Sequence, residues 1–83
     1  MAVTLDDIKQ WYEEGQRLKA THIIIVCDTY EHEDFPVYVM AGQNAREMVE
    51  KERALPMQRV MEVYSLSLPV EPQFKEPRAF HYD

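Results

Sequence analysis

The stretch ATHIIIVCDTYEHEDFPVYVM, residues 20–40, decides the fold. Its first part holds four consecutive β-branched apolar residues, Ile23–Val26, which pack well on a pleated sheet and lose rotamer freedom in a helix. A short run that is apolar at every position predicts a strand covered on both faces. A second apolar run, Val37–Met40, follows Pro36, and proline is tolerated at the first position of a strand. The two runs predict a β-hairpin.

The loop predicted between these strands, residues 28–35, is acidic and longer than the commonest hairpin loops. It has no Asn-Gly or Asp-Gly pair to fix a tight turn, so the sequence leaves the register open. Its carboxylates do not match a calcium loop, which needs a glycine at its sharp turn, and the chain has no paired zinc-ligand spacing. We therefore expect a solvated acidic loop, with no metal and no cofactor.

A helix is predicted on each side of the hairpin. Residues 4–19 carry apolar side chains at helical spacing, and Thr4 is placed to cap the first turn. Residues 44–53 form a second helix that Asn44 can cap. Pro56 prevents this helix from continuing.

Beyond Pro56 the pattern changes twice. Residues 57–66, MQRVMEVYSL, predict a third strand with apolar groups on both faces. From Pro69 onward, prolines exclude a long regular element, yet the aromatic residues of this segment are unusual for a disordered tail. We expect one domain over residues 1–68 and an extended tail, residues 69–83, on its own or a neighbouring subunit.

These elements predict the α+β class in the order α-β-β-α-β, with an extended C-terminal tail. The economical arrangement is a small three-stranded antiparallel sheet with both helices on one face. The other face would then be uncovered and would serve as a dimer surface or a ligand platform. The sequence therefore predicts a homodimer or a higher homo-oligomer.

Charge and cysteine content limit the partners and the cellular compartment that the sequence predicts. The 83 residues include 9 Lys and Arg against 15 Asp and Glu, a net charge of −6, whereas a groove that follows phosphates needs positive charge. We therefore expect no nucleic acid polymer as partner. The single cysteine, the absence of an N-terminal signal pattern and the absence of a long apolar span predict a cytoplasmic protein with no membrane partner.

A catalytic interpretation would use Cys27 as a thiol nucleophile, with His22 or His32 as base and Asp28 to orient it. Catalysis needs a lowered thiol pKa and an exposed, polar setting, whereas Cys27 is predicted to lie inside an apolar strand, where a free cysteine behaves as a small hydrophobe. The sequence thus favours a non-enzymatic protein, with a Cys27 thiol hydrolase as the weakest alternative.

The chain is rich in aromatic residues, whose faces can stack a base, while arginines can grip phosphate with two hydrogen bonds. This combination predicts a pocket for a small nucleotide, shared across a subunit boundary. The candidate ligand-binding residues are Arg59, Tyr38, Tyr64, Asp28, Thr29, Arg78 and His81.

The strings at residues 20–29, 33–39 and 57–64 resemble a group of small uncharacterised proteins of bacteriophages and bacteria. The group's pattern is similar to A-T-H-x-I-V-V-C-D-T-F-x-x-E-D-Y-P-V-Y-V, from which this chain departs at Tyr30 and Phe35. The resemblance implies a phage context, in which small proteins bind host factors or sequester the nucleotide signals of antiviral defence. The alternative to a nucleotide ligand is an acidic inhibitor that binds a host protein through the acidic loop and the second helix.

Overall fold

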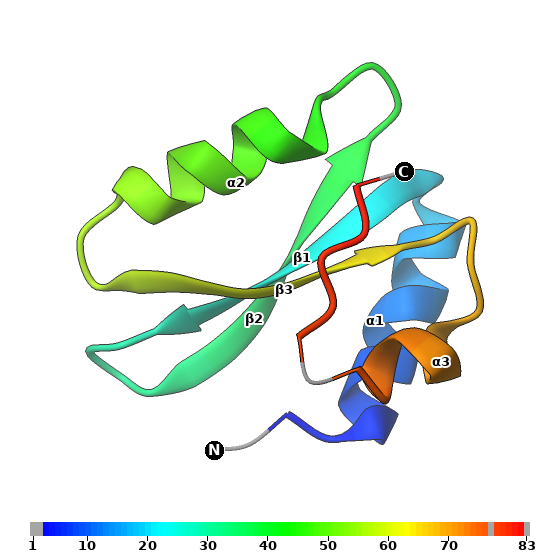
Figure 1. The fold of residues 1–83 in the computed structure, drawn as a ribbon, viewed down its shortest axis with the longest axis horizontal. Helices are drawn as coiled ribbons and strands as arrows, with labels where there is room; N and C mark the ends of the chain where they lie inside the picture. Colours follow the sequence, from blue (N-terminus) through cyan, green and yellow to red (C-terminus); the bar gives the residue numbers. More distant parts are fainter. Residues whose placement is uncertain (1–2, 77, 83) are drawn as a thin grey trace.

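The computed structural model describes residues 3–76 and 78–82. Its elements, seen in Figure 1, are α1 (Leu5–Arg17), β1 (Ala20–Asp28), β2 (Glu33–Met40), α2 (Ala45–Ala54), β3 (Gln58–Ser65) and α3 (Val70–Phe74). The strands form one antiparallel sheet in the order β2-β1-β3. The predicted α+β class and three-stranded antiparallel sheet are confirmed.

The central strand, β1, supplies both hydrophobic cores. Successive side chains of a strand point to opposite faces. Ile23 and Ile25 therefore belong to one buried cluster, and Ile24 and Val26 belong to the other. All four side chains are at most 2% exposed, so the fully apolar run is covered on both faces.

The two long helices cover opposite faces of the sheet. Ile8 of α1 packs in the cluster of Ile23, whereas Val49 of α2 packs in the cluster of Ile24. The prediction that both helices lie on one face is therefore wrong. A strand that is apolar on both sides needs cover on both sides. The predicted dimer was based on an uncovered sheet face, and both faces of this sheet are covered.

The turn of the hairpin is shorter than predicted, because it spans residues 29–32 rather than 28–35. Asp28 organises it: its carboxylate accepts the N–H of Tyr30 at 2.8 Å, and its carbonyl accepts the N–H of His32 at 2.7 Å. His32 adopts a left-handed φ of 59°, which tight turns usually assign to glycine. A tight turn thus forms without a glycine signal in the sequence.

Pro36 lies inside β2, opposite Ile25, and not at the start of the strand. The sheet order makes β2 an edge strand, and an edge strand tolerates a residue that has no N–H to donate. The pairing of β2 with β1 therefore begins three residues before the proline, at Glu33.

A bulge in β3 sorts its side chains between the two cores. Two adjacent residues of β1 pair with Glu62 and Val60, so Met61 is an extra residue in β3. A regular strand would place Val60 and Val63 on opposite faces. With the bulge, both valines pack in the cluster beneath α2.

The segment after β3 contains a helix where an extended tail was predicted. α3 follows Pro69, and Pro72 lies in its first turn, where backbone N–H groups have no acceptor within the helix. Beyond α3 the chain runs parallel to the outer edge of β3. The N–H of Val63 donates to the carbonyl of Ala79 at 2.7 Å, and the N–H of His81 donates to the carbonyl of Val63 at 3.0 Å.

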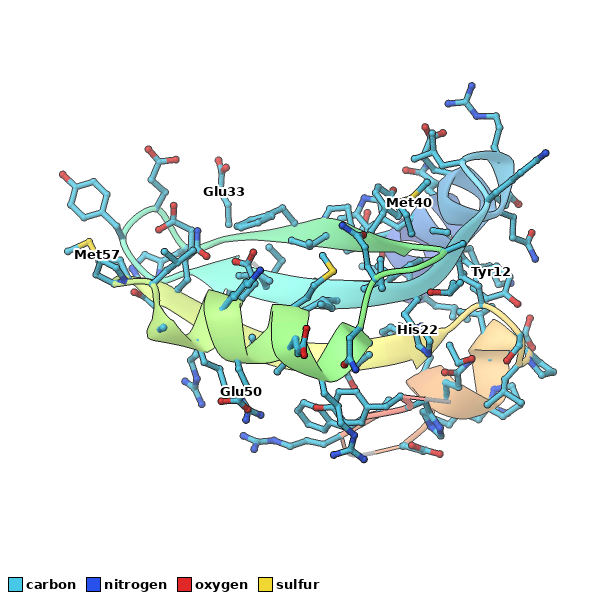
Figure 2. The ribbon with its side chains drawn as sticks, turned by 90° about the horizontal axis from the view of Figure 1, so that it is seen from above. Tyr12, His22, Glu33, Met40, Glu50 and Met57 are labelled. Carbon is cyan, nitrogen blue, oxygen red and sulfur yellow. The ribbon has the colours of Figure 1, made fainter. Side chains whose placement is uncertain are left out.

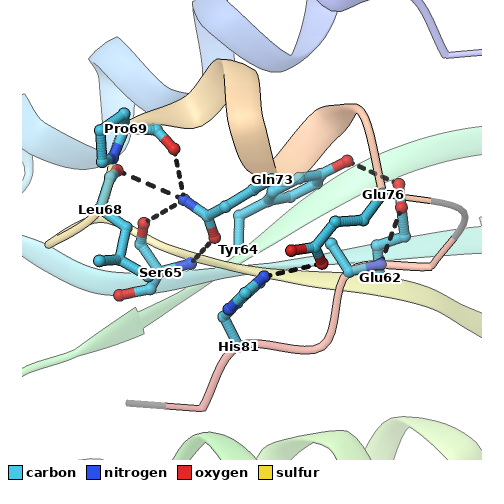
Figure 3. Close-up of polar contacts among 9 residues, drawn as sticks. Glu62, Tyr64, Ser65, Leu68, Pro69, Gln73, Glu76 and His81 are labelled. Atoms are coloured by element: carbon cyan, nitrogen blue, oxygen red, sulfur yellow. Dashed lines mark hydrogen bonds and ion pairs between the residues drawn. The ribbon is translucent and has the colours of Figure 1, made fainter.

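Gln73 joins α3 to the end of β3, as Figure 3 shows. Its side-chain oxygen accepts the N–H of Ser65 at 2.8 Å, and its Nε2 donates to the carbonyls of Ser65 and Pro69, both at 2.9 Å. Gln73 is 2% exposed and Ser65 0% exposed, so the hydrogen bonds between them are shielded from water.

We predict that Gln73→Ala lowers the free energy of unfolding by about 2–4 kcal/mol, because it removes the hydrogen bonds from Gln73 to the N–H and the carbonyl of buried Ser65. Gln73→Glu, which keeps the size but loses the Nε2 donor, should also destabilise the protein. Urea unfolding measures both changes, and Gln10→Ala, at an exposed position of α1, should change stability by less than about 0.5 kcal/mol. A Gln73→Ala variant as stable as this control would contradict the assignment.

Candidate functional site

The two tyrosines of the predicted pocket lie in the core under α1. Tyr38 and Tyr64 flank Ile23 from the two neighbouring strands. Tyr64 is 0% exposed, and its hydroxyl donates to Glu62 Oε1 at 2.6 Å. Burial, together with this hydrogen bond, raises the pKa of Tyr64 far above its usual range. Tyr64 therefore has no face for a ligand to stack on, and its predicted role is corrected to packing.

Tyr38 is half-buried against α1. Its ring carbons lie 3.4 Å from the position that a Cβ on Gly15 would occupy, so the glycine lets the helix approach the sheet closely. Burial raises the pKa of Tyr38, and the nearby Glu14 carboxylate adds to the rise. The Tyr38 ring fills space between helix and sheet.

Three other predicted residues lie at the hairpin end of the sheet. Asp28 holds the turn, the N–H of Thr29 donates to the carbonyl of Met57 at 2.8 Å, and the exposed Arg59 pairs across the sheet with Cys27. A strand advances about 3.3 Å per residue, so the four residues from Ile23 to Cys27 separate this group from the tyrosines by roughly 13 Å.

The last two predicted residues belong to the tail. Arg78 is exposed, and the His81 ring contacts Glu76 Oε2 at 2.9 Å (Figure 3). The seven predicted residues therefore occupy three regions of the chain and do not meet in one pocket.

Cys27 ends the apolar part of β1, with Asp34 opposite it in β2. Burial raises the pKa of the Cys27 thiol, and the hydrogen bond with Asp34 raises it further. A raised pKa leaves less of the reactive thiolate at neutral pH, and His22, one proposed base, lies five residues back along the same strand.

We predict that iodoacetamide alkylates native Cys27 more slowly at pH 8 than it alkylates the urea-unfolded chain, because the folded thiol has the higher pKa. Asp34→Asn should speed the reaction by lowering this pKa. Mass spectrometry of timed samples measures both rates. A native thiol that reacts faster than the unfolded one would restore the nucleophile hypothesis.

A recess of about 240 Å³ lies at the opposite end of the sheet from the hairpin turn. It is lined by His22, Gln43, Asn44, Ala45, Arg46 and Tyr82. A wider open groove of about 590 Å³ adjoins it, because His22 lines both. The other residues of the groove are Gln16, Ala20, Thr21, Leu66 and Ser67.

Arg46 is the cation of the recess. Its guanidinium lies over the Tyr82 ring, 4.4 Å from the ring centre, an arrangement that orients the positive group without neutralising it. Arg46 also lies in the first turn of α2, whose cap Asn44 accepts the N–H of Glu47 at 3.1 Å. The guanidinium and the positive end of the helix dipole both favour an anion here.

The groove offers hydroxyl groups beside apolar surface. Thr21 Oγ1 donates to the carbonyl of Val39 at 3.2 Å and lies 2.9 Å from His22 Nδ1. Ser67, whose Oγ lies 2.8 Å from Ser65 Oγ, also lines the groove, and Leu66 supplies apolar lining. The exposed surface of the groove is mostly apolar and that of the recess mostly polar, so the two hollows match a ligand with a less polar and a more polar part.

The recess was not predicted, because the arginines chosen as candidates, Arg59 and Arg78, lie outside the predicted helices. Asn44 was correctly predicted as a helix cap, and an arginine two residues later was a signal for positive charge at that helix end. The contribution of Tyr82 had no local signal, because 36 residues separate it from Arg46 in the chain.

The part of the chain that the structure describes shows neither a metal site nor a membrane-spanning helix. No group of three His, Cys, Asp or Glu side chains there is arranged to hold a metal ion. No helix among the same residues has both the length and the apolar character needed to cross a membrane. Comparisons with protein-family models, with curated proteins and with solved structures found no match.

Proposed function

We propose that this chain is a non-enzymatic binding protein that holds a small phosphorylated, nucleotide-like ligand in the recess and its adjoining groove. The observation that carries the proposal is the Arg46 guanidinium, which is held over Tyr82 in a recess at the start of α2. The recess replaces the residues chosen from sequence as the binding site.

The two hollows suit different parts of such a ligand. Arg46 would bind a phosphate with paired hydrogen bonds, beside the first N–H groups of α2. The groove would take the sugar and base, with Thr21 and Ser67 as hydrogen-bonding groups and Leu66 as apolar contact. The groove, about 590 Å³, is within the range of small-molecule sites, and the recess, about 240 Å³, is slightly smaller.

The resemblance to small phage proteins supports one ligand class within this proposal. Sequestration of a nucleotide signal of antiviral defence, in the host cytoplasm, needs tight binding and no chemistry. The homo-oligomer expected from sequence stays a prediction, and sedimentation at several concentrations tests it.

We predict that a matching nucleotide raises the melting temperature by about 5–10 °C at ten times its Kd, since binding then adds about 1.4 kcal/mol of stability. Differential scanning fluorimetry with cyclic dinucleotides, cyclic trinucleotides, ADP-ribose and inorganic phosphate measures the shift. The absence of any shift at millimolar concentration would overturn the proposal.

Arg46→Ala should weaken binding of the nucleotide found in this screen by about tenfold or more, because it removes a charge-assisted contact. Arg53→Ala is the matched control, because Arg53 lies in the last turn of the same helix and pairs with Glu50. Titration calorimetry on both variants compares the affinities. Equal affinities would place the ligand outside the recess.

A further inference from the structure

Three exposed apolar side chains gather at the hairpin end of the molecule. Tyr30, Leu55 and Met57 are 72%, 47% and 60% exposed, and we call them the tip patch. They come from two loops. A hydrogen bond of 2.8 Å from the N–H of Thr29 to the carbonyl of Met57 joins these loops. Figure 2 shows Met57 at one end of the sheet and His22, which lines the recess, at the other. The tip patch is therefore distinct from the proposed ligand site.

Both loops of the tip patch are held in place. The Asp28 carboxylate accepts the N–H of Tyr30, and the N–H of Leu55 donates to the carbonyl of Glu52 at 3.2 Å. Met57 has a left-handed φ of 62°, a conformation that bulky residues rarely adopt. Because the backbone is already ordered, a partner would pay little entropy to organise this surface.

The charge beside the tip patch is negative. The hairpin turn and its flanks carry four carboxylates within seven residues, and one of them, Glu33, is labelled near this end in Figure 2. These residues are Asp28, Glu31, Glu33 and Asp34. Positive charge comes from Arg59 and from Lys51 and Arg53 in the last turn of α2, and Arg53 pairs with Glu50. Over residues 28–34 and 51–59 five carboxylates stand against three Lys or Arg side chains, so the carboxylates remain in excess.

The negative charge beside the tip patch makes some partners more favourable than others. A second copy docked tip to tip would bring the same carboxylates together, and like charges at an interface are unfavourable. An anionic lipid surface would be repelled for the same reason. A segment with lysine or arginine beside apolar side chains meets both features of the surface.

We propose that the tip patch docks a basic amphipathic segment of a partner protein. Apolar side chains of the segment contact Tyr30, Leu55 and Met57, and its flanking cations pair with the carboxylates of the turn. Tyrosine is among the residues that most often anchor protein interfaces, so Tyr30 is assigned as the principal contact.

The test titrates the ¹⁵N-labelled protein with a synthetic helical peptide of leucine and lysine, with leucines at three- and four-residue spacing. We expect amide shifts confined to residues 28–34 and 54–59, and weaker binding at high salt. Tyr30→Ser should lower the affinity by about fivefold or more. Leu18→Ser, which alters a 42% exposed leucine just before the start of β1, is the matched control and should bind normally.

The same peptide with glutamate in place of lysine, or with serine in place of leucine, should not bind at the tip. Several outcomes overturn the proposal: no shifts, shifts centred on another acidic surface such as α1, unchanged affinity of Tyr30→Ser, or equal binding of the glutamate peptide. Tip shifts that depend on protein concentration without peptide would also overturn it, because they would identify a second copy as the occupant.

Discussion

Burial of four consecutive side chains in β1 is the constraint on which the rest of the structure depends. Ile23–Val26 alternate between two faces and are at most 2% exposed, so each face needs its own cover. In a chain of 83 residues one helix alone cannot cover both sides. α1 covers one face with the help of α3, and α2 covers the other with help from Phe80 and Tyr82.

This requirement explains why the C-terminal segment is part of the fold. Ala79 is 0% exposed in the core under α1, while the backbone around it bonds to the edge of β3. Gln73 satisfies the backbone at the end of that strand. Tyr82, which is brought back along β3, then reaches Arg46 at the start of α2.

With the two faces covered, both proposed binding surfaces lie at the ends of the sheet, and the two ends differ in chemistry. One end has Arg46, His22 and hydroxyl groups around a recess and groove, which suits a small anion attached to a less polar body. The other has an apolar patch beside carboxylates, which suits a basic protein segment. The excess of acids over bases is therefore compatible with the proposed anion site, because the charges are separated in space.

The sequence by itself determined the elements whose causes are local. The caps Thr4 and Asn44 each bond a backbone N–H three residues away, and the β-branched run at Ile23 makes a strand wherever it is placed. The sequence indicated only one part of the recess, the start of α2 at its cap Asn44.

Tertiary structure alone decided the helix faces, the bulge at Met61 and the contrast between a buried Tyr64 and a Tyr82 beside Arg46. These features depend on contacts between residues far apart in the chain. A tyrosine's own neighbours in sequence do not say which surface will pack against its ring, and that packing decides whether the ring belongs to a core or to a site.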